Sequence, residues 1–140
     1  MSIKQILFGG AEIKSGAASF GLMVIRGYAG ISLALAHGIH KIPPSEKFID
    51  GVGDLGFPVP VLFAWLASFS ELFGGILLAL GLATRPAAFM ISVTMGVAAF
   101  MRHAGDSFET MEKALLFLAI GILFLFAGAG DFAVDKAFRK

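Results

Sequence analysis

Four long apolar runs separated by short polar stretches dominate the chain. They cover approximately Ala17–His40, Val59–Gly81, Pro86–Met101 and Thr110–Gly128. A helix needs ~20 residues to cross a hydrocarbon layer of ~30 Å. The first two runs reach that length, and the third approaches it when Thr84 and Arg102 are included at its ends. The pattern therefore predicts four membrane-spanning helices.

The short connections predict how these helices follow one another. Only Leu82-Ala83-Thr84-Arg85 separates the second run from the third. Gly81 is suited to end one helix and Pro86 to start the next. The link between the third and fourth runs is similarly short. We expect an all-α, up-down four-helix bundle spanning residues 17–130, preceded by a juxtamembrane foot (1–16) and followed by a polar tail (131–140).

The first connection is the only one with room for further structure. Ile42-Pro43-Pro44 ends the first run, and Ser45 can cap a short helix that continues to Asp54. Apolar and charged residues are mixed in this stretch, which indicates a helix lying at the membrane interface. Such a helix could cover one mouth of the bundle.

The amino-terminal stretch is too short and too interrupted for a signal-peptide core, because Gly9 and Gly10 follow Ile6–Phe8. We expect Ile3, Ile6 and Leu7 to rest at the interface. The basic residues outside the runs divide six against four, which favours both termini in the cytoplasm of a bacterial inner membrane. The six are Lys4, Lys14, Arg85, Lys136, Arg139 and Lys140, and the four are Lys41, Lys47, Arg102 and Lys113.

The composition agrees with a lipid environment and excludes several classes of functional site. Hydrophobic residues make up 57% of the 140 residues and charged residues 15%, with a mean hydropathy of +0.85. The net charge of +1 gives no reason to expect a nucleic-acid partner. Because the chain has no cysteine, it has no disulfide framework, thiolate metal site or dithiol relay.

Two charged residues fall inside apolar runs, where an ionised group is costly unless it faces a partner or a cavity. Arg26 lies nine residues after Ala17, and Glu71 lies ten residues before Gly81. At ~1.5 Å per residue, antiparallel helices with aligned ends would hold both at roughly 14–15 Å from one face. An Arg26–Glu71 ion pair is thus expected, either as a structural lock or as part of a site.

Polar residues continue along the same helix faces. The first run carries a stripe at helical spacing, formed by Arg26, Gly30, Leu33, His37 and either His40 or Lys41. The second run has a face of small residues around Glu71, formed by Ala64, Ala67, Ser68, Gly74, Gly75 and Leu78. We expect both faces to point inward and to pack on each other.

The three histidines can meet at the outer mouth of the bundle. His37, His40 and His103, with Glu109 or Glu112 nearby, could ligate a metal, although no dense ligand motif is present. Interfacial histidines more often bond to backbone or water. Alternatively, an imidazole beside an aromatic slot could exchange protons with a carbonyl or quinol oxygen.

Taken together, the chain resembles the DoxX family of small four-helix membrane proteins. The residues that carry the resemblance are Arg26, His37-Gly38, Lys41, Phe48, Gly56-Phe57-Pro58, Glu71-Leu72-Phe73-Gly74-Gly75, Leu80 to Arg85, Glu112-Lys113-Ala114, Gly128-Ala129-Gly130 and Asp135. Ala129 replaces a proline that is common in the family at that position. The resemblance implies a membrane protein, in some relatives linked to quinone-dependent sulfur oxidation or to protection from quinone or oxidative stress.

We interpret the chain as a redox-linked membrane protein that binds a quinone-like ligand or serves as the membrane subunit of a quinone-dependent oxidoreductase. The candidate binding residues are Arg26, His37, His40, Lys41, Glu71 and Glu112, with His37 also the candidate catalytic, proton-exchanging group. Its expected partners are the lipid bilayer, a redox protein and a second copy of the chain. The alternatives are a non-catalytic scaffold that recruits an enzyme, or a carrier of small solutes or protons.

Overall fold

The computed structural model describes residues 3–138, and this part of the chain is helical with no strand. Four of its helices are long and apolar enough to cross a membrane. They are Gly16–Lys41, Pro60–Leu80, Thr84–Arg102 and Phe108–Ala127. The all-α fold and the four predicted spans are therefore confirmed, with boundaries that shift by a few residues.

Three of the four spans change their helical winding part of the way along. The first consists of α2 (Gly16–Leu33), the π-helical η1 (Ala34–Gly38) and the 3₁₀-helical η2 (Ile39–Lys41). The second consists of α4 (Pro60–Phe69), the π-helical η3 (Ser70–Gly74) and α5 (Gly75–Leu80). The third joins α6 (Thr84–Val97) to the π-helical η4 (Ala98–Arg102), whereas α7 (Phe108–Ala127) is continuous.

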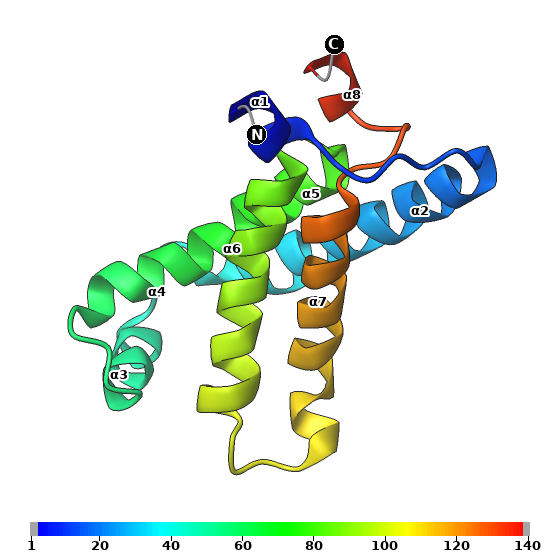
Figure 1. Ribbon diagram of the computed structural model, residues 1–140. Coiled ribbons are helices and arrows are strands. Elements are labelled where there is room, and N and C mark those ends of the chain that lie inside the picture. The colour runs from blue at the N-terminus through cyan, green and yellow to red at the C-terminus, as the bar shows by residue number, and fades with distance from the viewer. Residues whose placement is uncertain (1–2, 139–140) are drawn as a thin grey trace.

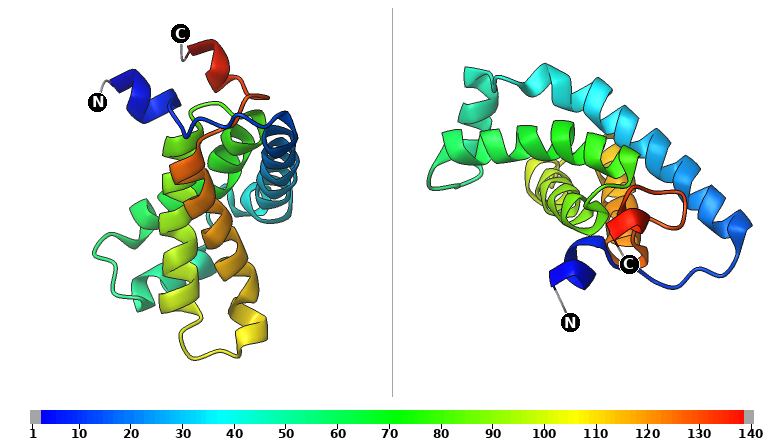
Figure 2. Two further views of the ribbon diagram at one scale, coloured as in Figure 1. Left: turned by 45° about the vertical axis from the view of Figure 1, so that its right-hand side comes forward. Right: turned by 90° about the horizontal axis from the view of Figure 1, so that it is seen from above.

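The spans form two antiparallel pairs. The first span runs alongside the second in the opposite direction, and α6 forms a hairpin with α7 (Figures 1 and 2). Figure 1 shows the α6–α7 hairpin crossing the first pair at a steep inclination. A simple up-down bundle with four nearly parallel helices therefore stays a prediction.

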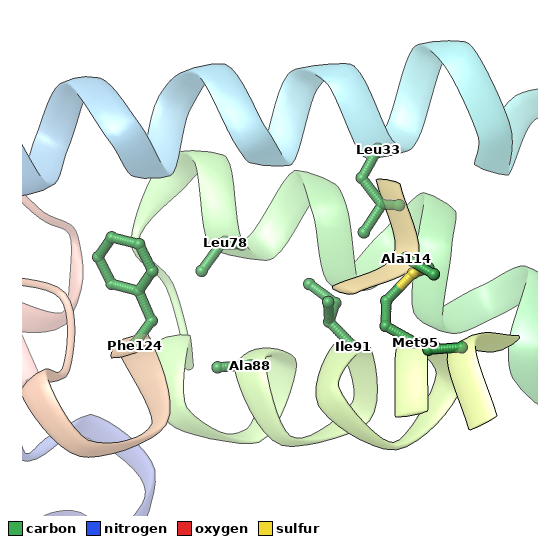
Figure 3. Packing of buried hydrophobic residues seen from close by; sticks show 8 residues of the cluster. Leu33, Leu78, Ala88, Ile91, Met95, Ala114 and Phe124 are labelled. Atoms are coloured by element: carbon green, nitrogen blue, oxygen red, sulfur yellow. The ribbon is translucent and has the colours of Figure 1, made fainter. Parts of the chain in front are cut away.

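The core lies where the two pairs meet. Leu33 and Leu78 from the first pair face Ile91, Met95 and Phe124 from the hairpin (Figure 3). Many large apolar side chains instead point outward, among them Leu116, which is 58% exposed, and Phe126, which is 72% exposed. Lipid is the solvent that such an outer surface requires.

Glycines bring the first two spans into backbone contact. A methyl group at Gly38 would lie 2.5 Å from Leu72 Cα, and one at Gly75 would lie 2.8 Å from the carbonyl oxygen of Gly30. Neither position can hold a larger side chain without moving a helix. The predicted inward faces of both spans are confirmed at this contact.

Short helices occupy the connection and the ends. The predicted helix after Ser45 is present as α3 (Glu46–Asp54), and the Ser45 hydroxyl accepts a hydrogen bond from the Phe48 backbone N–H. Its interfacial position stays a prediction. At the other end of the molecule, α1 (Ile3–Phe8) and α8 (Asp135–Phe138) meet through stacked rings of Phe8 and Phe138, 5.1 Å apart. Arg139 and Lys140 lie outside the described residues.

Candidate functional site

Arg26 is buried but does not pair with Glu71. Its side chain is 1% exposed, and its Nη1 donates to the carbonyl oxygens of Leu78, at 3.0 Å, and Ala79, at 2.8 Å. Nη2 donates to the carbonyl oxygen of Phe132 at 2.7 Å. The expected Arg26–Glu71 ion pair is therefore wrong.

The register of the first two spans explains the error. Gly30 packs against Gly75, and Gly38 packs against Leu72. These two contacts fix the register between the antiparallel helices. This register sets Arg26 beside the carboxyl end of α5, whereas Glu71 is level with η1. The expected pair required Ala17 and Gly81 to lie at the same level. Instead, the amino-terminal part of the first span extends well past the carboxyl end of the second.

Asp135 completes a structural clamp around the turn between α5 and α6. Its carboxylate accepts hydrogen bonds from the backbone N–H groups of Ala83, at 2.7 Å, and Thr84, at 3.0 Å. Arg26 binds carbonyls at the end of α5, and each charge thus complements the helix end that it faces. Asp135 is 0% exposed, although it belongs to the stretch expected to form a polar tail.

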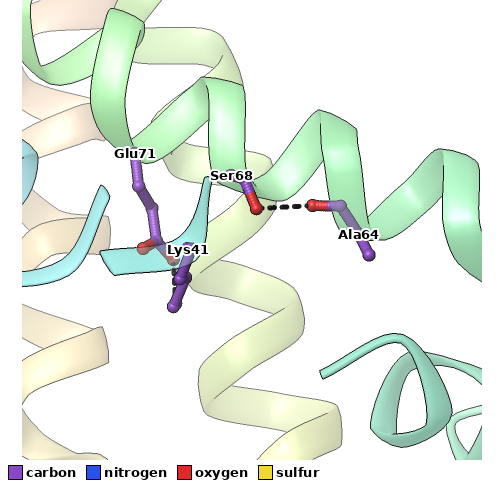
Figure 4. A network of polar contacts seen from close by, with 4 residues as sticks. All are labelled: Lys41, Ala64, Ser68 and Glu71. Atoms are coloured by element: carbon purple, nitrogen blue, oxygen red, sulfur yellow. Dashed lines mark hydrogen bonds and ion pairs between the residues drawn. The ribbon is translucent and has the colours of Figure 1, made fainter. Parts of the chain in front are cut away.

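Glu71 instead pairs with Lys41. Lys41 Nζ lies 2.7 Å from Glu71 Oε1, and the two side chains are 33% and 5% exposed (Figure 4). The second carboxylate oxygen, Oε2, is buried and has no hydrogen-bond partner among residues 3–138. Lys41 Nζ also lies 5.2 Å from the centre of the Phe48 ring, which ties α3 to the pair.

Three π-helical segments lie around this ion pair. Glu71 is in η3, η1 carries His37 and leads through η2 to Lys41, and η4 ends directly before His103. The segment η3 packs against both η1 and α6. Wide π turns change the direction in which side chains project and are common at functional sites.

A large cavity opens beside the pair. Its volume is about 670 Å³, within the range of small-molecule pockets. Aromatic and aliphatic side chains dominate its wall, including Phe48, Val52, Leu55, Phe57, Phe63, Leu66, Phe89, Met90, Val93 and Val97. Its polar lining includes Lys41, Ser70, Glu71, Arg102 and His103.

A smaller cavity of about 290 Å³ touches the same pair. Its polar lining comes from His37, Thr110 and Lys113 together with Lys41, Glu71 and His103, which it shares with the larger cavity. The His37 ring lies edge-on to Phe117, with ring centres 6.0 Å apart. The ion pair therefore borders an apolar cavity and a more polar one.

The structure brings together only some of the predicted site residues. His37, Lys41 and Glu71 line one or both cavities. Arg26 belongs to the clamp, and the exposed His40 and Glu112 line neither cavity. Sequence reasoning did not assign Ser70 or Arg102 to the site, although Ser70 directly precedes Glu71 and Arg102 follows the third apolar run.

The weak alternative of a histidine metal site is not formed in the described part of the chain. No three His, Cys, Asp or Glu side chains among residues 3–138 are grouped so that they could hold a metal ion. His103 Nδ1 lies 2.7 Å from Asp106 Oδ2, and His40 is exposed. His37 and His103 line the same smaller cavity, but no third side chain completes a metal-ligand group with them among residues 3–138.

This arrangement suits a molecule with an apolar body and a polar end. The wall of the larger cavity can bury the apolar part, and a few polar groups at one place can orient the head. Lys41 and Arg102 are donors there, whereas Glu71 is an acceptor when ionised. His37 could exchange a proton from the other side of the ion pair.

Two comparisons with known proteins found matches to this chain. The family model described as DoxX matches residues 21–104, which include most of the first span and all of the second and third. An uncharacterized protein from Haemophilus influenzae (strain ATCC 51907 / DSM 11121 / KW20 / Rd) is 40% identical over 97 residues, covering 64% of this chain and 69% of its own length. No solved structure matches the chain.

Proposed function

We propose that this protein, which belongs to the DoxX family of membrane proteins, binds a quinone-like lipid in the larger cavity. The observation that carries the proposal is a cavity of about 670 Å³ with an apolar wall, which has the Lys41–Glu71 ion pair at its border. A quinone has a flat head that accepts hydrogen bonds and an apolar tail. The cavity offers surroundings of both kinds.

Each part of the lining has a distinct role in this proposal. Phe48, Phe57 and Phe63 would pack on the ring and the start of the tail. Lys41 and Arg102 would donate to carbonyl oxygens of the head. The rings of Phe57 and Phe63 are in contact, with centres 4.7 Å apart and planes tilted by 40°, so they offer a preformed aromatic wall.

In this proposal His37 acts on the ion pair and does not touch the ligand directly. It lines the smaller cavity, and Lys41 and Glu71 stand on the border of both. In this proposal His37 exchanges protons with the polar end of the site through that pair. Electrons would come from a partner protein, since the chain has no cysteine of its own for a dithiol relay.

Binding can be tested with the purified full chain in lipid nanodiscs and decylubiquinone as the probe. We expect saturable binding, weakened about tenfold or more by Val97→Phe, because the larger ring fills part of the cavity. Val61→Phe is the matched control, since Val61 is 51% exposed on α4 and lines neither cavity. It should bind like the parent protein.

The same experiment distinguishes the alternatives. Equal binding by both variants would place the quinone in the surrounding lipid and count against the proposal. Absence of saturable binding, together with recovery of a redox enzyme from native membranes, would favour a scaffold. Flux of protons into proteoliposomes without any ligand would favour a carrier.

A further inference from the structure

Two consecutive residues that line the larger cavity, Ser70 and Glu71, each carry one buried side-chain atom with no hydrogen-bond partner among residues 3–138. The two atoms are Glu71 Oε2 and Ser70 Oγ. The residues themselves are 4% and 2% exposed. Buried polar groups are nearly always paired, so unpaired atoms on two consecutive residues of a cavity lining point to a ligand.

Two other serines in the spans, Ser68 and Ser92, differ from Ser70 because they bond to their own helix. The hydroxyls of Ser68 and Ser92 donate to carbonyl oxygens four residues earlier, Ala64 and Ala88, each at 2.8 Å. Ser70 opens the π-helical η3, where it makes no such bond. Its hydroxyl therefore has no partner among residues 3–138, although the residue lines the larger cavity.

Two further buried atoms without partners belong to a different place. Arg26 Nε and Thr84 Oγ1 lie in the clamp at the turn between α5 and α6, and neither residue lines a cavity. Among the buried unpaired side-chain atoms of the described residues, those at Ser70 and Glu71 are thus the ones on the cavity wall.

The chemistry of Glu71 restricts what can bind there. Oε1 already accepts from Lys41, and an ionised carboxylate can only accept hydrogen bonds. A ligand carbonyl next to Oε2 would leave two acceptors facing each other. A ligand hydroxyl would donate to Oε2, and its oxygen could in turn accept from Ser70 Oγ.

We propose that Glu71 Oε2 and Ser70 Oγ together bind a hydroxyl group on the head of the ligand, so that the site selects hydroxyl-bearing, quinol-type molecules over their carbonyl or ether counterparts. This inference rests on the proposed function, because it names the form of the ligand that the larger cavity prefers. A hydrogen bond from a ligand hydroxyl to a buried carboxylate is charge-assisted and therefore strong.

The test compares a phenol, which has a hydroxyl donor, with its methyl ether, in which a methyl group replaces the hydroxyl hydrogen. In nanodiscs, 4-dodecylphenol should bind the parent protein about tenfold or more tightly than 4-dodecylanisole, its methyl ether. Glu71→Gln should reduce this ratio to about threefold or less, because an amide can also donate to the ether oxygen. Ser70→Ala should lower it by a smaller factor.

Three outcomes separate this inference from the proposed function. Equal binding of the phenol and the ether by the parent protein, with decylubiquinone still bound, overturns the hydroxyl selection alone. Failure of all three probes to bind overturns the ligand site itself. Unchanged selectivity in Glu71→Gln, with parent-like helicity by circular dichroism, shows that another group reads the hydroxyl and overturns the role of Glu71.

Discussion

At the scale of single residues, the two charges in the apolar runs have different tasks. Arg26 donates to backbone carbonyls at the end of α5, and Asp135 accepts from the amides that begin α6. Together they hold the turn between two spans. Glu71 lies on a cavity border, and one of its carboxylate oxygens has no partner within residues 3–138. Only the second charge belongs to the candidate site.

Asp135→Ala should destabilise the protein by about 2–4 kcal/mol, because it removes a cap from α6 and leaves Arg26 without the carboxylate opposite it. Unfolding monitored in mild detergent measures the change. Asp131→Ala is the matched control, since Asp131 is exposed and makes only two long contacts, with the buried Ser19 hydroxyl at 3.3 Å and with Lys136 at 3.4 Å. It should cost less than about 1 kcal/mol. Equal losses in both variants would contradict the clamp.

Sequence alone could identify Arg26 and Glu71 as buried charges but not their partners. The cost of a charge in lipid follows from its place in an apolar run. The partner depends on the register between helices, which the glycine contacts set and hydropathy does not reveal. Asp135 was missed because it follows a glycine-rich exit, where a carboxylate is ordinarily solvated.

At the scale of elements, three π-helical segments and two close glycine contacts shape the site. Gly38 brings η1 against the backbone of η3 at Leu72. Gly38 lies three residues before Lys41, and Leu72 directly follows Glu71, so this contact adjoins the ion pair. The length of the apolar runs predicted the spans, and Ser45 predicted the start of α3. The π segments have no such signature, because their hydrophobic pattern differs little from that of an α-helix.

Gly38→Ala should separate η1 from η3, since its methyl group would lie 2.5 Å from Leu72 Cα. We expect a loss of roughly 1–3 kcal/mol in stability, together with weaker decylubiquinone binding. Gly27→Ala is the control, because a methyl group at Gly27 would meet no atom of a neighbouring segment within 4 Å. It should leave stability and binding unchanged or slightly raise stability. Thermal unfolding and binding isotherms of the two variants provide the comparison. Parent-like behaviour of Gly38→Ala would argue against backbone packing at this contact.

At the scale of the whole molecule, the chain combines an apolar exterior with polar chemistry gathered around Lys41 and Glu71. Both α1 and α8 lie at the end away from α3 and from the α6–α7 connection (Figure 2). This arrangement agrees with the predicted division of basic residues between two sides. The cytoplasmic location of the termini stays a prediction.

Topology can be measured directly because the parent chain contains no cysteine. Single cysteines at Lys14 and Lys136 should react with a membrane-impermeant maleimide only in inverted vesicles, since the basic termini face the cytoplasm. Cysteines at Asp50 and Gly105 should react in intact spheroplasts. Labelling of the Lys14 and Asp50 positions from the same side would exclude an odd number of crossings between them.

The most direct test of the central claim is photolabelling of the full chain in native-like lipid with an azido-quinone, followed by mapping of the modified residues. The account predicts adducts on the wall of the larger cavity, within α3, α4 and α6, that excess decylubiquinone suppresses. Adducts confined to the lipid-facing side of α7, or adducts that decylubiquinone does not suppress, would contradict it.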